Sequence, residues 1–90
     1  MNSRDRLIKL LHDFSEQVLS VKQFCASYER TFNLEIDRSE LSPAERAVFQ
    51  VLFNEVVYYS PYEEDRIKYP GYRNDAQIRD AAARAIKQLT

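Results

Sequence analysis

The stretch that decides the fold is SPAERAVFQVLFNEVVYYSP, residues 42–61. It places Ser42 at a helix cap, Pro43 at the first helical position and Glu45 three residues after the cap. Ser60-Pro61 ends the helix, because a residue before proline avoids helical backbone angles. One side of this helix carries Ala44, Val48, Val51, Leu52, Glu55, Val56 and Tyr59, and Ala47, Phe49 and Phe53 widen it. An apolar face this broad predicts a central helix that contacts several others.

Two further helices are predicted on the N-terminal side. The first begins near Ser3 and ends near Val18 or Leu19, and the second begins with a capping box between Ser20 and Gln23. The second is expected to end at residues 33–34, and its start lies only one or two residues after the first. The two should therefore form an antiparallel hairpin. Their apolar faces consist of Leu7, Ile8, Leu11, Phe14 and Val18 in the first, and Val21, Phe24, Cys25, Tyr28 and Phe32 in the second.

The C-terminal side is predicted to hold a long loop and a last helix. Residues 61–73 contain two prolines and the single glycine, and such long loops are often functional. Asn74-Asp75-Ala76-Gln77 offers another cap, followed by an apolar face that includes Ile78 and Leu89. Residues 35–41 form a polar connection beneath which Leu34 and Ile36 are expected to pack. These features predict an all-α protein, an antiparallel four-helix bundle in which residues 1–90 form one domain.

Composition agrees with helices and indicates a cytoplasmic protein. One glycine and three prolines are few for a β-rich domain of 90 residues. The lone Cys25 allows no internal disulfide, which suits a reducing compartment. No apolar run approaches the roughly 20 residues that cross a bilayer, and residues 1–9 do not resemble a secretory signal. We therefore expect no membrane association, and a monomer or weak dimer.

Catalytic chemistry is hard to assemble from this sequence. His12 is the only histidine and has no cysteine or second histidine at metal-ligand spacing. A nucleophilic pair of His12 with Cys25 is conceivable, but Cys25 stands among aromatic residues, where a small buried side chain is the usual role. One glycine cannot make a phosphate-binding loop. We expect no enzyme, no catalytic residue, no metal and no cofactor.

The charges are distributed unevenly along the chain. Residues 35–65 carry two basic and eight acidic side chains, whereas residues 66–90 carry six basic and two acidic ones. The acidic middle argues against nucleic acid and favours a cationic partner. A rival interpretation is a helix-turn-helix DNA-binding protein that contacts phosphates with Arg79, Arg84 and Lys87, but these residues more simply form a solvated face.

Tyrosines and carboxylates gather at the end of the third helix and in the loop after it. Tyrosine is enriched at protein interfaces, and carboxylates near such anchors complement a basic surface. Some of these tyrosines can instead be core or loop packing, and the acidic run a solvated turn. Our candidate partner-binding residues are Glu55, Tyr59, Tyr62, Glu63, Glu64 and Asp65, with Asp37 and Glu40 joining from the earlier connection.

Several segments resemble the colicin D immunity proteins and the related immunity proteins of contact-dependent growth inhibition. These segments are residues 24–30, 52–53, 57–66, 69–72 and 75–89. The resemblance implies an antiparallel four-helix bundle that binds a nuclease toxin attacking transfer RNA and is not itself a catalyst. It also implies that an acidic surface fills the toxin's basic cleft, with Glu63, Glu64 and Asp65 matching the acidic segment of the family.

The function predicted from the sequence is therefore immunity against a cognate bacterial toxin with a basic surface. Rigidly placed carboxylates would satisfy the cations that such a toxin uses for its substrate. Tyrosines stand where relatives are more acidic, so the toxin need not cleave transfer RNA. The alternative is a small helical adaptor or regulatory protein without a toxin partner.

Overall fold

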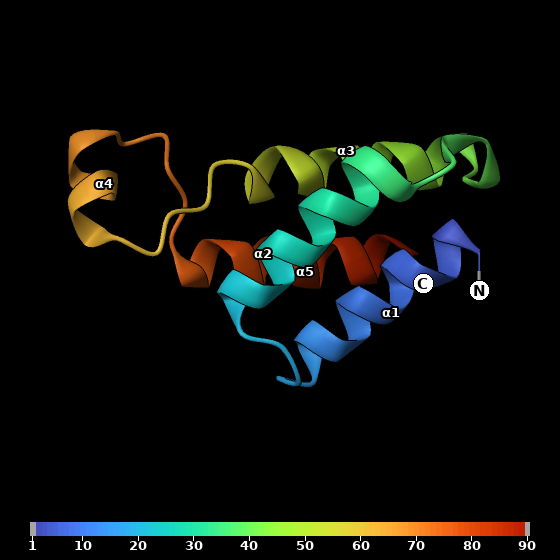
Figure 1. Cartoon of the computed structure of the whole chain (residues 1–90), viewed down its shortest axis with the longest axis horizontal. Coiled ribbons are helices and arrows are strands. Elements are labelled where there is room, and N and C mark those ends of the chain that lie inside the picture. Colours follow the sequence, from blue (N-terminus) through green and yellow to red (C-terminus); the bar gives the residue numbers. More distant parts are fainter. Residues whose placement is uncertain (1, 90) are drawn as a thin grey trace.

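The computed structural model describes residues 2–89, and every regular element in them is helical (Figure 1). The α-helices are α1 (Ser3–Ser15), α2 (Val21–Arg30), α3 (Pro43–Val56), α4 (Glu63–Lys68) and α5 (Asp75–Leu89). A π-helical turn, η1 (Thr31–Glu35), continues α2, and a 3₁₀ turn, η2 (Arg38–Glu40), precedes α3. The all-α prediction is confirmed for this part of the chain.

The predicted helix starts are confirmed in atomic detail. Ser20 and Gln23 form a reciprocal capping box at α2, and Ser42 and Glu45 form one at α3 with Pro43 in its first turn. At α5 the Asn74 side chain accepts a hydrogen bond from the Gln77 backbone at 2.8 Å, and the Gln77 side chain accepts one from the Asn74 backbone at 2.9 Å. Each cap satisfies N–H groups that a helix start leaves without partners.

The core lies between the four long helices, and α5 packs most extensively on α3. The alanines of α5 allow that close approach, because they have no side chain beyond Cβ. In Figure 1, α2 crosses α3 and α5, with α1 on the other side of α5. The buried residues are Leu7, Leu11, Phe14, Val21, Phe24, Cys25, Tyr28, Phe32, Leu41, Phe49, Leu52, Val56, Ile78, Ala81, Ala82 and Ala85.

A column of aromatic rings runs through this core along α2. The Phe14 and Phe24 rings stack with centroids 4.2 Å apart, and Tyr28 and Phe32 continue the column at 5.5 and 5.8 Å. Phe53 packs on Phe32 at 5.1 Å. Arginines lie over two of these rings: the Arg79 guanidinium is 5.0 Å from the Phe14 ring centroid, and that of Arg38 is 4.7 Å from the Phe32 ring centroid. The column joins α1, α2, η1 and α3 into one packed unit.

Several details of the sequence prediction are wrong. Helix α1 ends at Ser15, not at Val18 or Leu19, so residues 16–20 separate it from α2. Gln17 adopts a φ of 64°, which reverses the chain and leaves Val18 beyond the helix and exposed.

Two more side chains expected inside are outside. Leu34 is exposed rather than tucked under the connection, because the π-helical turn carries it to the outer side, whereas Ile36 does pack on the core. Val51 is exposed because α3 is covered only on the side that presents Phe49, Leu52 and Val56.

The predicted loop over residues 61–73 contains helix α4. This short helix follows Pro61, has an acidic first turn and a basic last turn, and buries none of its residues. Such charges match the helix dipole at both ends. Figure 1 shows α4 standing apart from the long helices, at one end of the molecule.

Candidate functional site

Two backbone hydrogen bonds hold the chain on both sides of α4 together. The Arg73 N–H donates to the Tyr58 carbonyl at 2.7 Å, and the Ser60 N–H donates to the Arg73 carbonyl at 3.0 Å. They form an isolated parallel bridge between Tyr59 and Arg73. Residues 60–72 therefore leave the long helices and return to them at one point.

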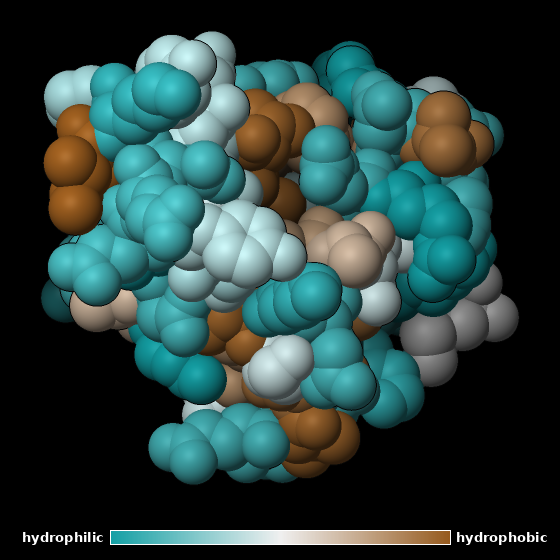
Figure 2. Space-filling model, turned by 60° about the vertical axis from the view of Figure 1, so that its left-hand side comes forward, coloured by the Kyte–Doolittle hydropathy of each residue, from teal (hydrophilic) through white to brown (hydrophobic). Residues whose placement is uncertain are grey.

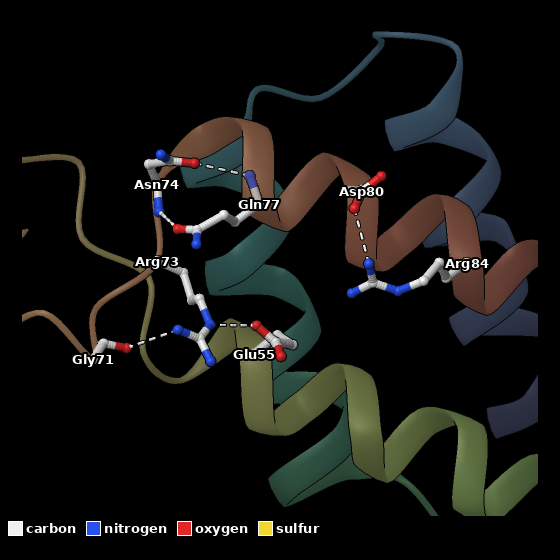
Figure 3. A network of polar contacts seen from close by, with 7 residues as sticks. All are labelled: Glu55, Gly71, Arg73, Asn74, Gln77, Asp80 and Arg84. Atoms are coloured by element: carbon white, nitrogen blue, oxygen red, sulfur yellow. Dashed lines mark hydrogen bonds and ion pairs between the residues drawn. The ribbon is translucent and has the colours of Figure 1, made fainter.

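Arg73 also fixes this junction with its side chain. Its Nε donates to a Glu55 carboxylate oxygen at 2.5 Å, and its Nη1 donates to the Gly71 carbonyl at 3.3 Å (Figure 3). Glu55, a predicted contact residue, is therefore half-buried and occupied by an ion pair inside the protein. Farther along α5, Figure 3 shows a separate surface pair between Asp80 and Arg84 at 2.8 Å.

Ser60 organises the start of residues 60–72, which we call the α4 excursion. This serine is 5% exposed, and its hydroxyl donates to Asp65 at 3.1 Å while its carbonyl accepts from Arg66 at 2.7 Å. The Tyr62 backbone N–H donates to the same hydroxyl at 3.3 Å. Asp65, another predicted contact residue, thus has a positioning role for α4.

Tyr59 is also used internally. It is half-buried against the core, and its hydroxyl donates to the Asp75 carboxylate at 2.7 Å. Partial burial, and then the neighbouring Asp75, raise the pKa of the Tyr59 phenol. Tyr59 therefore ties the end of α3 to the start of α5, and its hydroxyl is engaged within the chain.

The predicted residues that stay exposed at this end are Tyr62, Glu63 and Glu64. Within residues 2–89, neither glutamate side chain has a hydrogen-bond or ion-pair partner. Large exposed side chains occur in the same stretch of chain: Ile67 is 75% exposed, Tyr62 62%, Tyr69 53% and Tyr58 52%. We call this set, consisting of Tyr58, Tyr62, Glu63, Glu64, Ile67 and Tyr69, the α4 surface.

Sequence reasoning did not select Tyr58, Ile67 or Tyr69 as contact residues. Tyr58 and Tyr69 belong to the predicted tyrosine cluster but not to the predicted contact residues, and Ile67 belongs to neither. Only a helix over residues 63–68 with no buried face makes the exposure of all three evident. The face that Figure 2 brings forward shows hydrophobic residues as separate brown patches among polar and pale ones. Apolar contacts on this face are thus distributed rather than gathered into one large patch.

Asp37 and Glu40 lie elsewhere in the molecule. They belong to the turn before α3, whereas α4 follows the other end of that helix (Figure 1). The 14 residues of α3 separate the two groups by about 20 Å. Asp37 accepts hydrogen bonds from the backbone and hydroxyl of Ser39 at 3.0 and 2.6 Å, which lower the pKa of its carboxyl. The structure does not bring the eight predicted residues onto one surface.

Folding pairs three of the eight acidic side chains of residues 35–65 with arginines from outside that segment. Arg4 pairs with Glu45 at 2.5 Å, Arg6 with Glu35 at 3.1 Å, and Arg73 with Glu55. In each pair the acid comes from residues 35–65 and the base from outside them. The charge imbalance seen along the sequence is therefore smaller on the folded surface.

Cys25 and His12 are the other candidate groups from the sequence. Cys25 is buried, and burial raises the pKa of its thiol to about 12, which disfavours the reactive thiolate. His12 lies on the exposed side of α1. Among residues 2–89, no three histidine, cysteine or acidic side chains are grouped to hold a metal ion, and no helix is long and apolar enough to span a membrane.

Comparison with known proteins identifies no family for this chain. No family model matches the chain, and no curated protein and no solved structure is significantly similar to it.

Proposed function

We propose that this protein is a binding protein without catalytic activity, which neutralises a cognate bacterial toxin in the cytoplasm through the α4 surface. In this proposal an antiparallel four-helix bundle serves as the rigid support, and α4 fills the toxin's basic cleft. The observation that carries the proposal is that α4 buries none of its own residues and is still held firmly at its base. A helix that contributes nothing to the core is best explained by contacts outside the chain.

The composition of the α4 surface suits this role. Tyrosine and isoleucine side chains supply apolar contact area, and aromatic anchors commonly dominate interface energetics. Glu63 and Glu64 supply negative charge without internal partners. The α4 surface has only these two carboxylates. They should steer a basic partner and speed association, while the apolar side chains provide most of the affinity.

Two double variants separate these contributions. Tyr62→Ala with Ile67→Ala removes apolar area and should raise the dissociation constant for the toxin by roughly 30-fold, which corresponds to about 2 kcal/mol. Glu63→Lys with Glu64→Lys should mainly slow association at low salt, and added salt should reduce that difference. Asp65 is left intact in both because its carboxylate is bonded to Ser60.

The test screens the proteins encoded by neighbouring genes as candidate toxins, with binding kinetics and protection of cells that express the candidate as readouts. Glu16→Lys with Glu29→Lys is a matched control, since it reverses two exposed charges outside the α4 surface. The control should protect as wild type does. If Tyr62→Ala with Ile67→Ala folds normally and still protects fully, the α4 surface is not the binding site. Binding through α4 to a partner that is not a toxin would favour the adaptor alternative.

A further inference from the structure

A hollow of about 410 Å³ lies at the start of α3, at the end of that helix away from α4. The hollow is open to solvent, because every lining residue except Phe32 is exposed, so a ligand would lie against the surface rather than be enclosed. Phe32, Pro43 and Ala47 give it an apolar floor. Its polar lining residues are Arg38, Arg46 and Gln50, and no acidic residue lines it.

Arg38 is held in place over the aromatic column. Its guanidinium lies 4.7 Å from the Phe32 ring centroid, and Phe32 is buried between Tyr28 and Phe53. A guanidinium over an aromatic face is oriented by that contact and can still donate hydrogen bonds from its edge. The stack therefore pre-orients one cation at the hollow.

Arg46 supplies a second cation. Within residues 2–89 its guanidinium has no hydrogen-bond, ion-pair or aromatic partner. The carboxylate of Asp37, close by in sequence, accepts hydrogen bonds from Ser39 and does not line the hollow. The two guanidinium groups that line the hollow therefore carry a charge of +2, next to its apolar residues.

We propose that this hollow binds a phosphate monoester carried on a small planar apolar group. A phosphate monoester has a charge of about −1.5 to −2 at pH 7, which matches two guanidinium groups better than a carboxylate does. Arginine suits phosphate because its planar fork donates two parallel hydrogen bonds. The volume exceeds what a bare phosphate needs, and the apolar floor accounts for the organic part. This site is separate from the α4 surface, so it stands whether or not that surface binds a toxin.

The experiment titrates the full chain with phenyl phosphate while recording amide NMR shifts. The amides of Arg46, Ala47 and Gln50 should shift in a saturable manner, and Arg46→Gln should weaken binding by about tenfold or more. Lys22→Gln removes the same charge at the opposite end of α2 and should change binding by less than about twofold. Circular dichroism checks that each variant folds. Arg38→Gln serves as a second variant and should weaken binding similarly.

Two other probes distinguish the parts of the ligand. Inorganic phosphate tests the charged group alone and benzoate tests a carboxylate on the same ring, and both should bind more weakly than phenyl phosphate. Absence of saturable shifts at about 10 mM phenyl phosphate, or equal weakening by Lys22→Gln and Arg46→Gln, would overturn the proposal. Equal binding of inorganic phosphate would overturn the organic part, and equal binding of benzoate would overturn the preference for a phosphate.

Discussion

Replacing Tyr28 by phenylalanine removes one hydroxyl from the centre of the core and leaves the ring in place. Tyr28 is fully buried, and its hydroxyl donates to the Phe49 carbonyl of α3 at 2.7 Å. A neutral hydrogen bond of this kind contributes about 0.5–1.5 kcal/mol to the free energy of unfolding. The carbonyl inside α3 retains the backbone N–H four residues later as a donor, so no buried acceptor is left without a partner. We therefore expect Tyr28→Phe to cost about 1 kcal/mol, which lowers the Tm by about 4–8 °C.

Urea denaturation followed by circular dichroism measures this cost. Two further variants give a lower and an upper reference. Tyr62→Phe changes an exposed tyrosine, and its free energy of unfolding should stay within about 0.5 kcal/mol of wild type. Phe24→Ala removes a fully buried ring stacked 4.2 Å from Phe14 and should cost about 3–5 kcal/mol. If Tyr28→Phe matched the Tyr62 variant, the hydroxyl would contribute nothing. If it matched Phe24→Ala, the ring packing could not be the main contribution of Tyr28, and the reasoning would fail.

Two other changes test burial and backbone geometry. Burial raises the pKa of the Cys25 thiol from 9.0 to about 12. Below pH 9 the thiol is neutral in both the folded and the unfolded chain, so folded stability is complete there. As the pH rises from 9 towards 12, only the unfolded chain loses the proton readily, and the free energy of unfolding falls. Urea midpoints across that range should fall less in Cys25→Ala than in wild type, although the buried Tyr28, whose pKa is also raised, leaves part of the fall in both. Gly71→Ala should leave stability unchanged or raise it by up to about 1 kcal/mol in the same assay, because Gly71 has no positive φ and an added Cβ meets no atom within 4 Å. A clear loss of stability there would show that the turn requires glycine.

Much of the fold follows from local signals in the sequence. Ser20, Ser42 and Asn74 each mark a helix start because cap chemistry involves residues only three positions apart. Helix α4 was missed because Tyr62 makes no side-chain cap and the segment has no buried stripe to produce a period. The charges of that segment were the remaining signal, acidic in the first turn and basic in the last.

The candidate site was harder to predict because it depends on contacts between distant residues. The pairs Arg4–Glu45, Arg6–Glu35 and Arg73–Glu55 join residues 41, 29 and 18 positions apart. A count of charges along the chain cannot include such pairs, so it overstated the acidity of the surface. Similarly, Glu55, Tyr59 and Asp65 have the right chemistry for an interface but are engaged in holding the α4 excursion in place. Only the fold separates those residues from Tyr62, Glu63 and Glu64.

The parallel bridge between Tyr59 and Arg73 has a consequence for how this protein can change over time. Because residues 61–72 leave and rejoin the long helices at one fastened point, substitutions at their exposed positions impose no movement on α3 or α5. Asp65 and Arg66 are the exceptions, since both form hydrogen bonds with the buried Ser60. The exposed positions of that segment can therefore change quickly, while the helices change slowly because their buried side chains must keep packing. A segment taken from another protein would therefore need ends the same distance apart and also partners for the hydroxyl and the carbonyl of Ser60, which is buried.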